Sequence, residues 1–138
     1  QKNLTYAAQK ASNNGKTILI EPLNLLDNPG YHLSTLDEAL VTLEAVNHPS
    51  LKIMFDCYHL QIMQGNLLQR LQRHLPKIGH IQFANAPGRT EPDKGEINFP
   101  WLFAEIDRIG WNGFLGAEYI PLEKTEESLG WLQIFKRS

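Results

Sequence analysis

Four residues whose side chains can donate an oxygen atom to a metal ion recur along the chain, each about one strand–loop–helix unit after the last. They are Glu21, Asp56, Gln82 and Glu118. A single acidic residue at a strand end is usually a solvated loop residue or a helix cap, so it is the recurrence over four successive units that favours a shared site. Three carboxylates that converge without a cation repel one another, and their convergence therefore calls for a divalent metal ion. Carboxylate and amide oxygens form a hard ligand set, which favours Mg²⁺ or Mn²⁺ over Zn²⁺.

The elements that must position these residues alternate between short apolar strands and amphipathic helices. Strands are expected over residues 17–21, 51–56, 78–82 and 114–118, so each strand ends at one of the oxygen donors. Helices are expected from a cap at Ser34 or Thr35 to Val46, from Ile62 through Leu71 to a stop at Pro76, over 100–109 and over 125–135, with the end of an earlier helix over 1–14.

The strands also predict which apolar residues accompany the oxygen donors. Alternation places Leu19, Met54, Ile78 and Phe114 on the same faces as the four donors. The side chain of Cys57 is expected to point the other way, toward the helices. The three tryptophans, Trp101, Trp111 and Trp131, are expected to pack in the core.

Strands that alternate with helices predict an α/β fold with a parallel sheet and right-handed crossovers. Closing a (β/α)8 barrel takes eight such units and this chain supplies four, so it is either a small open α/β sheet or half of a barrel. Periodicity alone does not choose between them. The 138 residues contain no obvious linker, so a single domain is expected over 1–138. If the strand faces that carry the four oxygen donors point inward in a barrel, these donors form one ring at its catalytic rim.

Composition excludes several classes of function. The formal net charge is −2 and there is no basic run, which disfavours binding to nucleic acid or to an anionic membrane through charge. No apolar run approaches the roughly 18 residues of a membrane span. The one cysteine excludes an internal disulfide framework and is compatible with a reducing compartment, so a cytoplasmic location is expected. The chain begins with Gln1 rather than Met, which indicates a processed product or a fragment.

The segments around the oxygen donors resemble the hydroxypyruvate isomerase family, one of the xylose isomerase-like barrels. The similarity runs from about Asn13 to Trp131. The segments that carry it are IEPLN at 20–24, FDCYH at 55–59, QIMQGNL at 61–67, GHIQ at 79–82, PGRTEP at 87–92, GEINFP at 95–100 and GAEY at 116–119. The resemblance implies that the chain is the carboxyl-terminal half of a (β/α)8 barrel.

The resemblance also implies an activity. Members interconvert hydroxypyruvate and tartronate semialdehyde in a metal-dependent reaction, in which two glutamates move a proton between neighbouring carbons through a cis-enediolate. By position these glutamates are Glu21 and Glu118, which would hold the metal together with Asp56 and Gln82. Epimerase relatives carry histidine where Gln82 stands, which favours the isomerase branch.

Three further residues are candidates for binding the substrate, a small hydroxy-carbonyl acid. His59 matches a family position that hydrogen-bonds a substrate oxygen, and the alternative role is that of a histidine at a helix start. Arg89 suits a substrate carboxylate, because guanidinium binds carboxylate bidentately, although it could be a solvated surface charge. Asn24 is equally compatible with orienting Glu21 or the substrate and with capping a loop.

Three competing functions remain at this point: a ketose epimerase, an endonuclease IV-like phosphodiesterase and a non-catalytic half-barrel. The phosphodiesterase would need a histidine-rich zinc site and a basic face, and only one of the five histidines lies directly at the expected site. A half-barrel leaves open strand edges and exposed inner residues. The chain alone is therefore expected to be inactive, and to associate with the amino-terminal half of a barrel or with itself.

Overall fold

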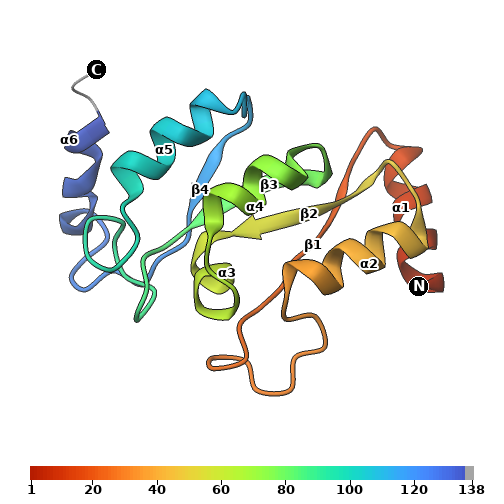
Figure 1. Cartoon of the computed structure of the whole chain (residues 1–138), viewed down its shortest axis with the longest axis horizontal. Helices are drawn as coiled ribbons and strands as arrows, with labels where there is room; N and C mark the ends of the chain where they lie inside the picture. Colours follow the sequence, from red (N-terminus) through yellow and green to blue (C-terminus); the bar gives the residue numbers. More distant parts are fainter. Residues whose placement is uncertain (136–138) are drawn as a thin grey trace.

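Four parallel strands form one sheet in the computed structural model, which describes residues 1–135. They are β1 (Ile18–Ile20), β2 (Leu51–Asp56), β3 (Ile78–Phe83) and β4 (Leu115–Ala117), and each strand pairs in parallel with the next (Figure 1). The predicted parallel α/β fold is confirmed. No strand boundary differs from its prediction by more than one residue, because short apolar runs between turn residues define these strands well.

Helices alternate with the strands and cover one face of the sheet. They are α1 (Lys2–Ser12), α2 (Leu36–Val46), α3 (Cys57–Met63), α4 (Leu67–His74), α5 (Phe99–Arg108) and α6 (Leu132–Phe135), with short 3₁₀ turns η1 (Leu75–Lys77) and η2 (Glu127–Trp131). The main core lies between these helices and the sheet, and it includes Leu36, Ile53, Phe55, Cys57, Leu71, Ile81, Phe83, Phe99 and Ile106. None of the helices within residues 1–135 is long and apolar enough to cross a membrane.

The two faces of the sheet differ in burial. Along β2, Leu51, Ile53 and Phe55 are at most 3% exposed, whereas the intervening Lys52 and Met54 are only half-buried. Phe114, just before β4, is 89% exposed. The face opposite the helices is therefore open, although it carries apolar side chains.

Ile78 does not lie on that open face, and the prediction from simple alternation is wrong here. The register shifts within the β2–β3 pair: Ile53 pairs with Ile78, but Met54 pairs with His80, so Gly79 is an extra residue in β3. Ile78 is consequently buried in the helix-side core, and Gly79 takes the inner position. A Cβ at Gly79 would lie 2.5 Å from Leu19 Cδ2 and 3.0 Å from Lys52 Cβ.

Two predicted helices are also divided. The single helix expected from Ile62 to Pro76 is split into α3 and α4, because Gly65 and Asn66 both adopt left-handed backbone angles, with φ of 61° and 52°. The helix expected over 125–135 is replaced by η2 and the short α6.

The prediction that all three tryptophans pack in the core is wrong for one of them. Trp131 is buried and Trp111 packs against the core, but Trp101 is 53% exposed. Phe99, Leu102 and Ile106 form the buried stripe of α5, and Trp101 lies outside that stripe.

We expect Gly79→Ala to lower the free energy of unfolding by about 1–3 kcal/mol, because the added methyl group overpacks the inner face against Lys52. Gly130→Ala is the matched control, since a Cβ there meets no atom within 4 Å. Urea denaturation of both variants is the measurement. Equal stability of the two variants would contradict the assigned position of Gly79.

Candidate metal and substrate site

The four predicted oxygen donors lie at the carboxyl ends of four adjacent strands. Glu21 follows β1 directly, Asp56 is the last residue of β2 and Glu118 follows β4 directly. Gln82 pairs with Asp56 in the register of β2 and β3, and the backbone N–H of Glu118 donates to Phe83 O across 3.0 Å. Since the strands are parallel and adjacent, all four donors share one edge of the sheet. This edge is the rim at which barrel enzymes place their active sites.

Asp56 is the buried centre of this edge. Its Oδ1 caps α3 by accepting hydrogen bonds from the backbone N–H groups of Tyr58, at 2.7 Å, and His59, at 3.4 Å. Its Oδ2 accepts no hydrogen bond and points away from the cap. Glu21, Asp56 and His59 each offer one ligand atom, and these three atoms lie within 4.8 Å of one another, close enough to hold a metal ion.

Buried atoms without hydrogen-bond partners concentrate at the same edge. Within the described residues, five buried side-chain atoms make no hydrogen bond, and four of them are Glu21 Oε1, Asp56 Oδ2, His59 Nε2 and Gln82 Oε1. A buried polar atom without a partner costs about 1–3 kcal/mol, so a cluster of such atoms indicates a site that binds a ligand. Three of the four are oxygens, which fits a hard divalent cation.

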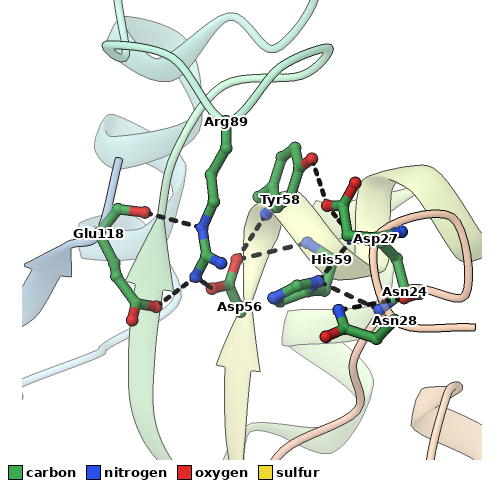
Figure 2. Close-up of polar contacts among 8 residues, drawn as sticks. All are labelled: Asn24, Asp27, Asn28, Asp56, Tyr58, His59, Arg89 and Glu118. Atoms are coloured by element: carbon green, nitrogen blue, oxygen red, sulfur yellow. Dashed lines mark hydrogen bonds and ion pairs between the residues drawn. The ribbon is translucent and has the colours of Figure 1, made fainter. Parts of the chain in front are cut away.

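Arg89 supplies the positive charge of the site. Its Nε donates to the backbone oxygen of Glu118 at 3.1 Å, and its Nη2 lies 2.6 Å from Glu118 Oε2 and 3.8 Å from Asp56 Oδ2 (Figure 2). The guanidinium also lies over the Tyr58 ring, 5.5 Å from its centroid. Arg89 thus connects carboxylates from two strands that are not neighbours in the sheet.

The loop that carries Arg89 is organised by two buried residues that sequence reasoning missed. The Asn85 side chain donates to Pro92 O and Ile97 O, and accepts from the backbone N–H groups of Ala86 and Ile97. The carboxylate of Glu91 accepts from the Leu122 N–H at 3.0 Å and ties the loop to the segment after β4. The PGRTEP segment contains Glu91, but its spacing gives no sign that the carboxylate is buried.

The other side of the site is a hydrogen-bonded network around His59. Asn24 is fully buried, and both its backbone N–H and its side-chain nitrogen contact His59 Nδ1, at 3.1 and 2.7 Å. Asp27 accepts from the Asn24 side chain and from the Tyr58 hydroxyl, at 2.9 and 2.6 Å (Figure 2). Asp27 and Tyr58 were not predicted; Tyr58 adjoins the predicted motif, and no pattern in the sequence singles out Asp27.

Burial and like charge shift the acidities of the site. Burial, together with the neighbouring Asp56 and Glu118 carboxylates, raises the pKa of Glu21 from 4.5 to about 7, against the opposing effect of Arg89. Burial also raises the pKa of Asp56, although the Tyr58 N–H and Arg89 oppose this. The pKa of His59 falls to about 4, because burial and then Arg89 disfavour its cation. Hydrogen bonds from Tyr58 and Asn24 lower the pKa of Asp27.

Several known proteins are similar to this chain. A model of the family described as "Xylose isomerase-like TIM barrel" matches residues 1–135. The chain is 46% identical to a 2-oxo-tetronate isomerase of Cupriavidus necator, over 96% of this chain and 51% of that protein. It is 41% identical to the hydroxypyruvate isomerase of Escherichia coli, over 98% of this chain and 52% of that protein. A crystal structure described as an AP endonuclease, family 2, from Brucella melitensis superposes with a TM-score of 0.93 at 40% identity. The match covers 96% of this chain and 51% of that one. The chain spans about half the length of each.

The raised pKa of Glu21 predicts how stability depends on pH. The folded, metal-free protein keeps a proton on Glu21 that the unfolded chain has lost above its ordinary pKa of 4.5, so the free energy of unfolding falls as pH rises toward about 7. Glu21→Gln should make this fall shallower. Urea denaturation in EDTA at several pH values is the measurement.

The matched control is Glu44→Gln, which changes an exposed glutamate of α2 paired with Lys77. It should show the same decline as the unmodified protein. A Glu21→Gln profile that coincides with the Glu44→Gln profile would show that Glu21 titrates in its ordinary range.

Proposed function

Because the chain belongs to the xylose isomerase-like TIM barrel family, we propose that it forms half of the catalytic barrel of a metal-dependent isomerase that interconverts hydroxypyruvate and tartronate semialdehyde. The membership predicted from the sequence motifs is confirmed by the match over residues 1–135. The observation that carries the proposed activity is the cluster of buried, unpartnered atoms at one strand edge. Relatives named for isomerisation of small 2-oxo acids support it.

The residues that would hold the metal are Glu21, Asp56, Gln82 and Glu118. Their donor set consists of carboxylate and amide oxygens, which favours Mg²⁺ or Mn²⁺. When bound, the metal would polarise the substrate carbonyl and stabilise negative charge on the substrate oxygens. The cation would also relieve the repulsion from Asp56 and Glu118, which adds to the effect of burial in raising the pKa of Glu21.

Glu21 and Glu118 are the proposed proton-transfer groups. Conversion of hydroxypyruvate requires loss of a proton from C3, formation of a cis-enediolate, delivery of a proton to C2 and transfer of the hydroxyl proton from the C3 oxygen to the C2 oxygen. A carboxylate beside the substrate can accept a proton from one carbon as a general base and return it to the next carbon as a general acid. Glu118 comes from the far edge strand, and its Oε2 is held by Arg89.

Arg89 and His59 are the proposed substrate-binding groups. The Arg89 guanidinium suits the substrate carboxylate, because it offers several N–H donors in one plane. It already neutralises the carboxylates of Asp56 and Glu118, at 3.8 and 2.6 Å. His59 presents the unpartnered Nε2 to the same space.

A second substrate is favoured by one observation. The relative that is 46% identical is named 2-oxo-tetronate isomerase, and 2-oxo-tetronate shares the carboxylate, the 2-carbonyl and the 3-hydroxyl of hydroxypyruvate. The same proton transfer between C3 and C2 serves both acids. A phosphodiesterase is disfavoured, because the net charge is −2 and the ligand set is dominated by oxygen.

The open face of the sheet needs a partner that covers its apolar side chains. This face carries the apolar side chains of Leu19 and Met54, and Phe114 is 89% exposed beside β4. Burying each such side chain contributes about 1.5–3 kcal/mol. We propose that another barrel half covers this face: the amino-terminal half of a barrel, or a second copy of this chain.

Light scattering after size-exclusion chromatography tests this. The isolated chain should self-associate or aggregate, and Phe114→Ser should weaken the association. Leu26→Ser is the control, since Leu26 is 76% exposed but belongs to the loop after β1 and not to the sheet. A monodisperse, cooperatively melting monomer would contradict the proposal.

Turnover and metal affinity test the proposed activity in a barrel completed with the part of the Escherichia coli relative that this chain does not match. With Mg²⁺, this barrel should isomerise hydroxypyruvate or 2-oxo-tetronate in preference to neutral ketoses. Asp56→Asn keeps an oxygen to cap α3 but removes a charge. It should lower Mg²⁺ affinity by at least about tenfold, since even residues behind metal ligands have effects of 10–100-fold.

Asp107→Asn, on the exposed side of α5, is the matched control and should leave both affinity and rate unchanged. Isothermal titration calorimetry measures the affinity. Unchanged affinity and turnover in Asp56→Asn would exclude Asp56 from the metal site.

A further inference from the structure

His59 lies within a metal-sized cluster with Glu21 and Asp56, so its geometry alone is compatible with metal binding. The contacts on the other side of the ring decide its role. The backbone N–H of Asn24 points at His59 Nδ1 across 3.1 Å. A backbone N–H can only donate, so Nδ1 must carry a lone pair. The proton of the neutral imidazole is therefore on Nε2.

The Asn24 side chain reinforces this assignment. Its nitrogen lies 2.7 Å from Nδ1 and also donates to the Asp27 carboxylate at 2.9 Å. Its oxygen accepts from the backbone N–H of Asp27 at 2.9 Å. Turning the amide over would bring two oxygens together at Asp27 and two N–H groups together at its backbone. Asp27 therefore fixes which end of the amide faces His59.

Tyr58 completes the support. Its hydroxyl donates to the same oxygen of Asp27 at 2.6 Å. Asp27 lies at the surface, whereas Asn24 and His59 are at most 1% exposed. The network thus runs from an exposed carboxylate through a buried amide to a buried ring, and each hydrogen bond in it has one direction.

We propose that Asn24, oriented by Asp27, positions His59 as a fixed Nε2–H donor to an oxygen of the bound substrate and keeps His59 out of the metal's ligand set. The inference rests on the proposed function and deepens it. Nε2 is buried without a hydrogen-bond acceptor. A cation satisfies the unpartnered oxygens of Glu21, Asp56 and Gln82, but it cannot satisfy an N–H group. On this proposal the bound substrate supplies the missing acceptor oxygen.

This places a requirement on the substrate. It must present a carbonyl or hydroxyl oxygen that accepts the hydrogen bond from His59. This oxygen must lie close to the side-chain oxygens of Glu21, Asp56 and Gln82. A donor at this position favours the form of the substrate in which that oxygen is most negative, which is the enediolate. Asn24, which sequence reasoning gave as a substrate-binding candidate, is on this proposal a positioning residue that acts through His59.

Nitrogen-15 NMR of the histidine-labelled chain, within the same completed barrel that is used for the turnover test, examines the proposal without any need for turnover. With His59 assigned through the backbone, we expect a protonated Nε2 and an unprotonated Nδ1 in the metal-free protein. After saturation with Mg²⁺, Nε2 should still be protonated. A protonated Nδ1, a doubly protonated ring or loss of the Nε2 proton on Mg²⁺ addition would overturn the proposal.

Two variants test the positioning role. Asn24→Ala removes one of the two donors to Nδ1 and should shift the His59 nitrogen resonances toward a mixture of tautomers. Asn28→Ala is the matched control: it lies in the same loop, and its side chain donates to Asn24 O, not to His59. Equal spectra from the two variants would remove Asn24 from the role.

The measurements separate this proposal from the proposed function. Failure to bind Mg²⁺ or to isomerise either acid would count against the proposed function, while the tautomer of His59 in the metal-free protein would still decide the proposal. If Asn24→Ala does not fold, the spectrum of the unmodified protein alone decides it.

Discussion

The gathering of negative charge at the carboxyl edge of the sheet is the constraint on which the rest of the site depends. Glu21, Asp56 and Glu118 come from three different strand ends, and parallel pairing brings them together whether or not their charges are balanced. Several interactions offset this repulsion. The first N–H groups of α3 bind Asp56, and Arg89 bridges to Glu118. The remaining repulsion acts on Glu21, whose pKa is raised first by burial and then by the Asp56 and Glu118 carboxylates.

These responses depend on backbone that lies some distance from the charges. The loop that carries Arg89 is organised from inside by Asn85, and Glu91 fastens it to the backbone after β4. The N–H of Ile120 also donates to Arg89 O, at 2.7 Å. Two loops that are far apart in sequence are thereby held as one unit, and the position of the cation is set by neutral hydrogen bonds as much as by the charges it meets.

Much of this arrangement could be predicted from the sequence, and the limits have physical causes. Strand positions followed from apolar runs, and the shared edge followed from parallel pairing. The positions of Glu21, Asp56, Gln82 and Glu118 needed nothing else. Asn85, Glu91 and Asp27 could not be predicted, because their importance lies in contacts with backbone groups distant in the chain. The break between α3 and α4 was indicated by Gly65, but a continuous apolar pattern masked it.

The extra residue in β3 separates two demands on one strand. Counted in a simple pleat, Ile78 and Gln82 would have the same parity, yet one serves the hydrophobic core and the other serves the rim. Gly79 changes the parity between them. One strand thus supplies Ile78, Ile81 and Phe83 to the core and Gln82 to the rim, and the extra residue lets Ile78 and Gln82 face opposite sides of the sheet. The extra residue therefore shifts the alternation of side chains, so that β3 follows one inward–outward pattern before Gly79 and the opposite pattern after it.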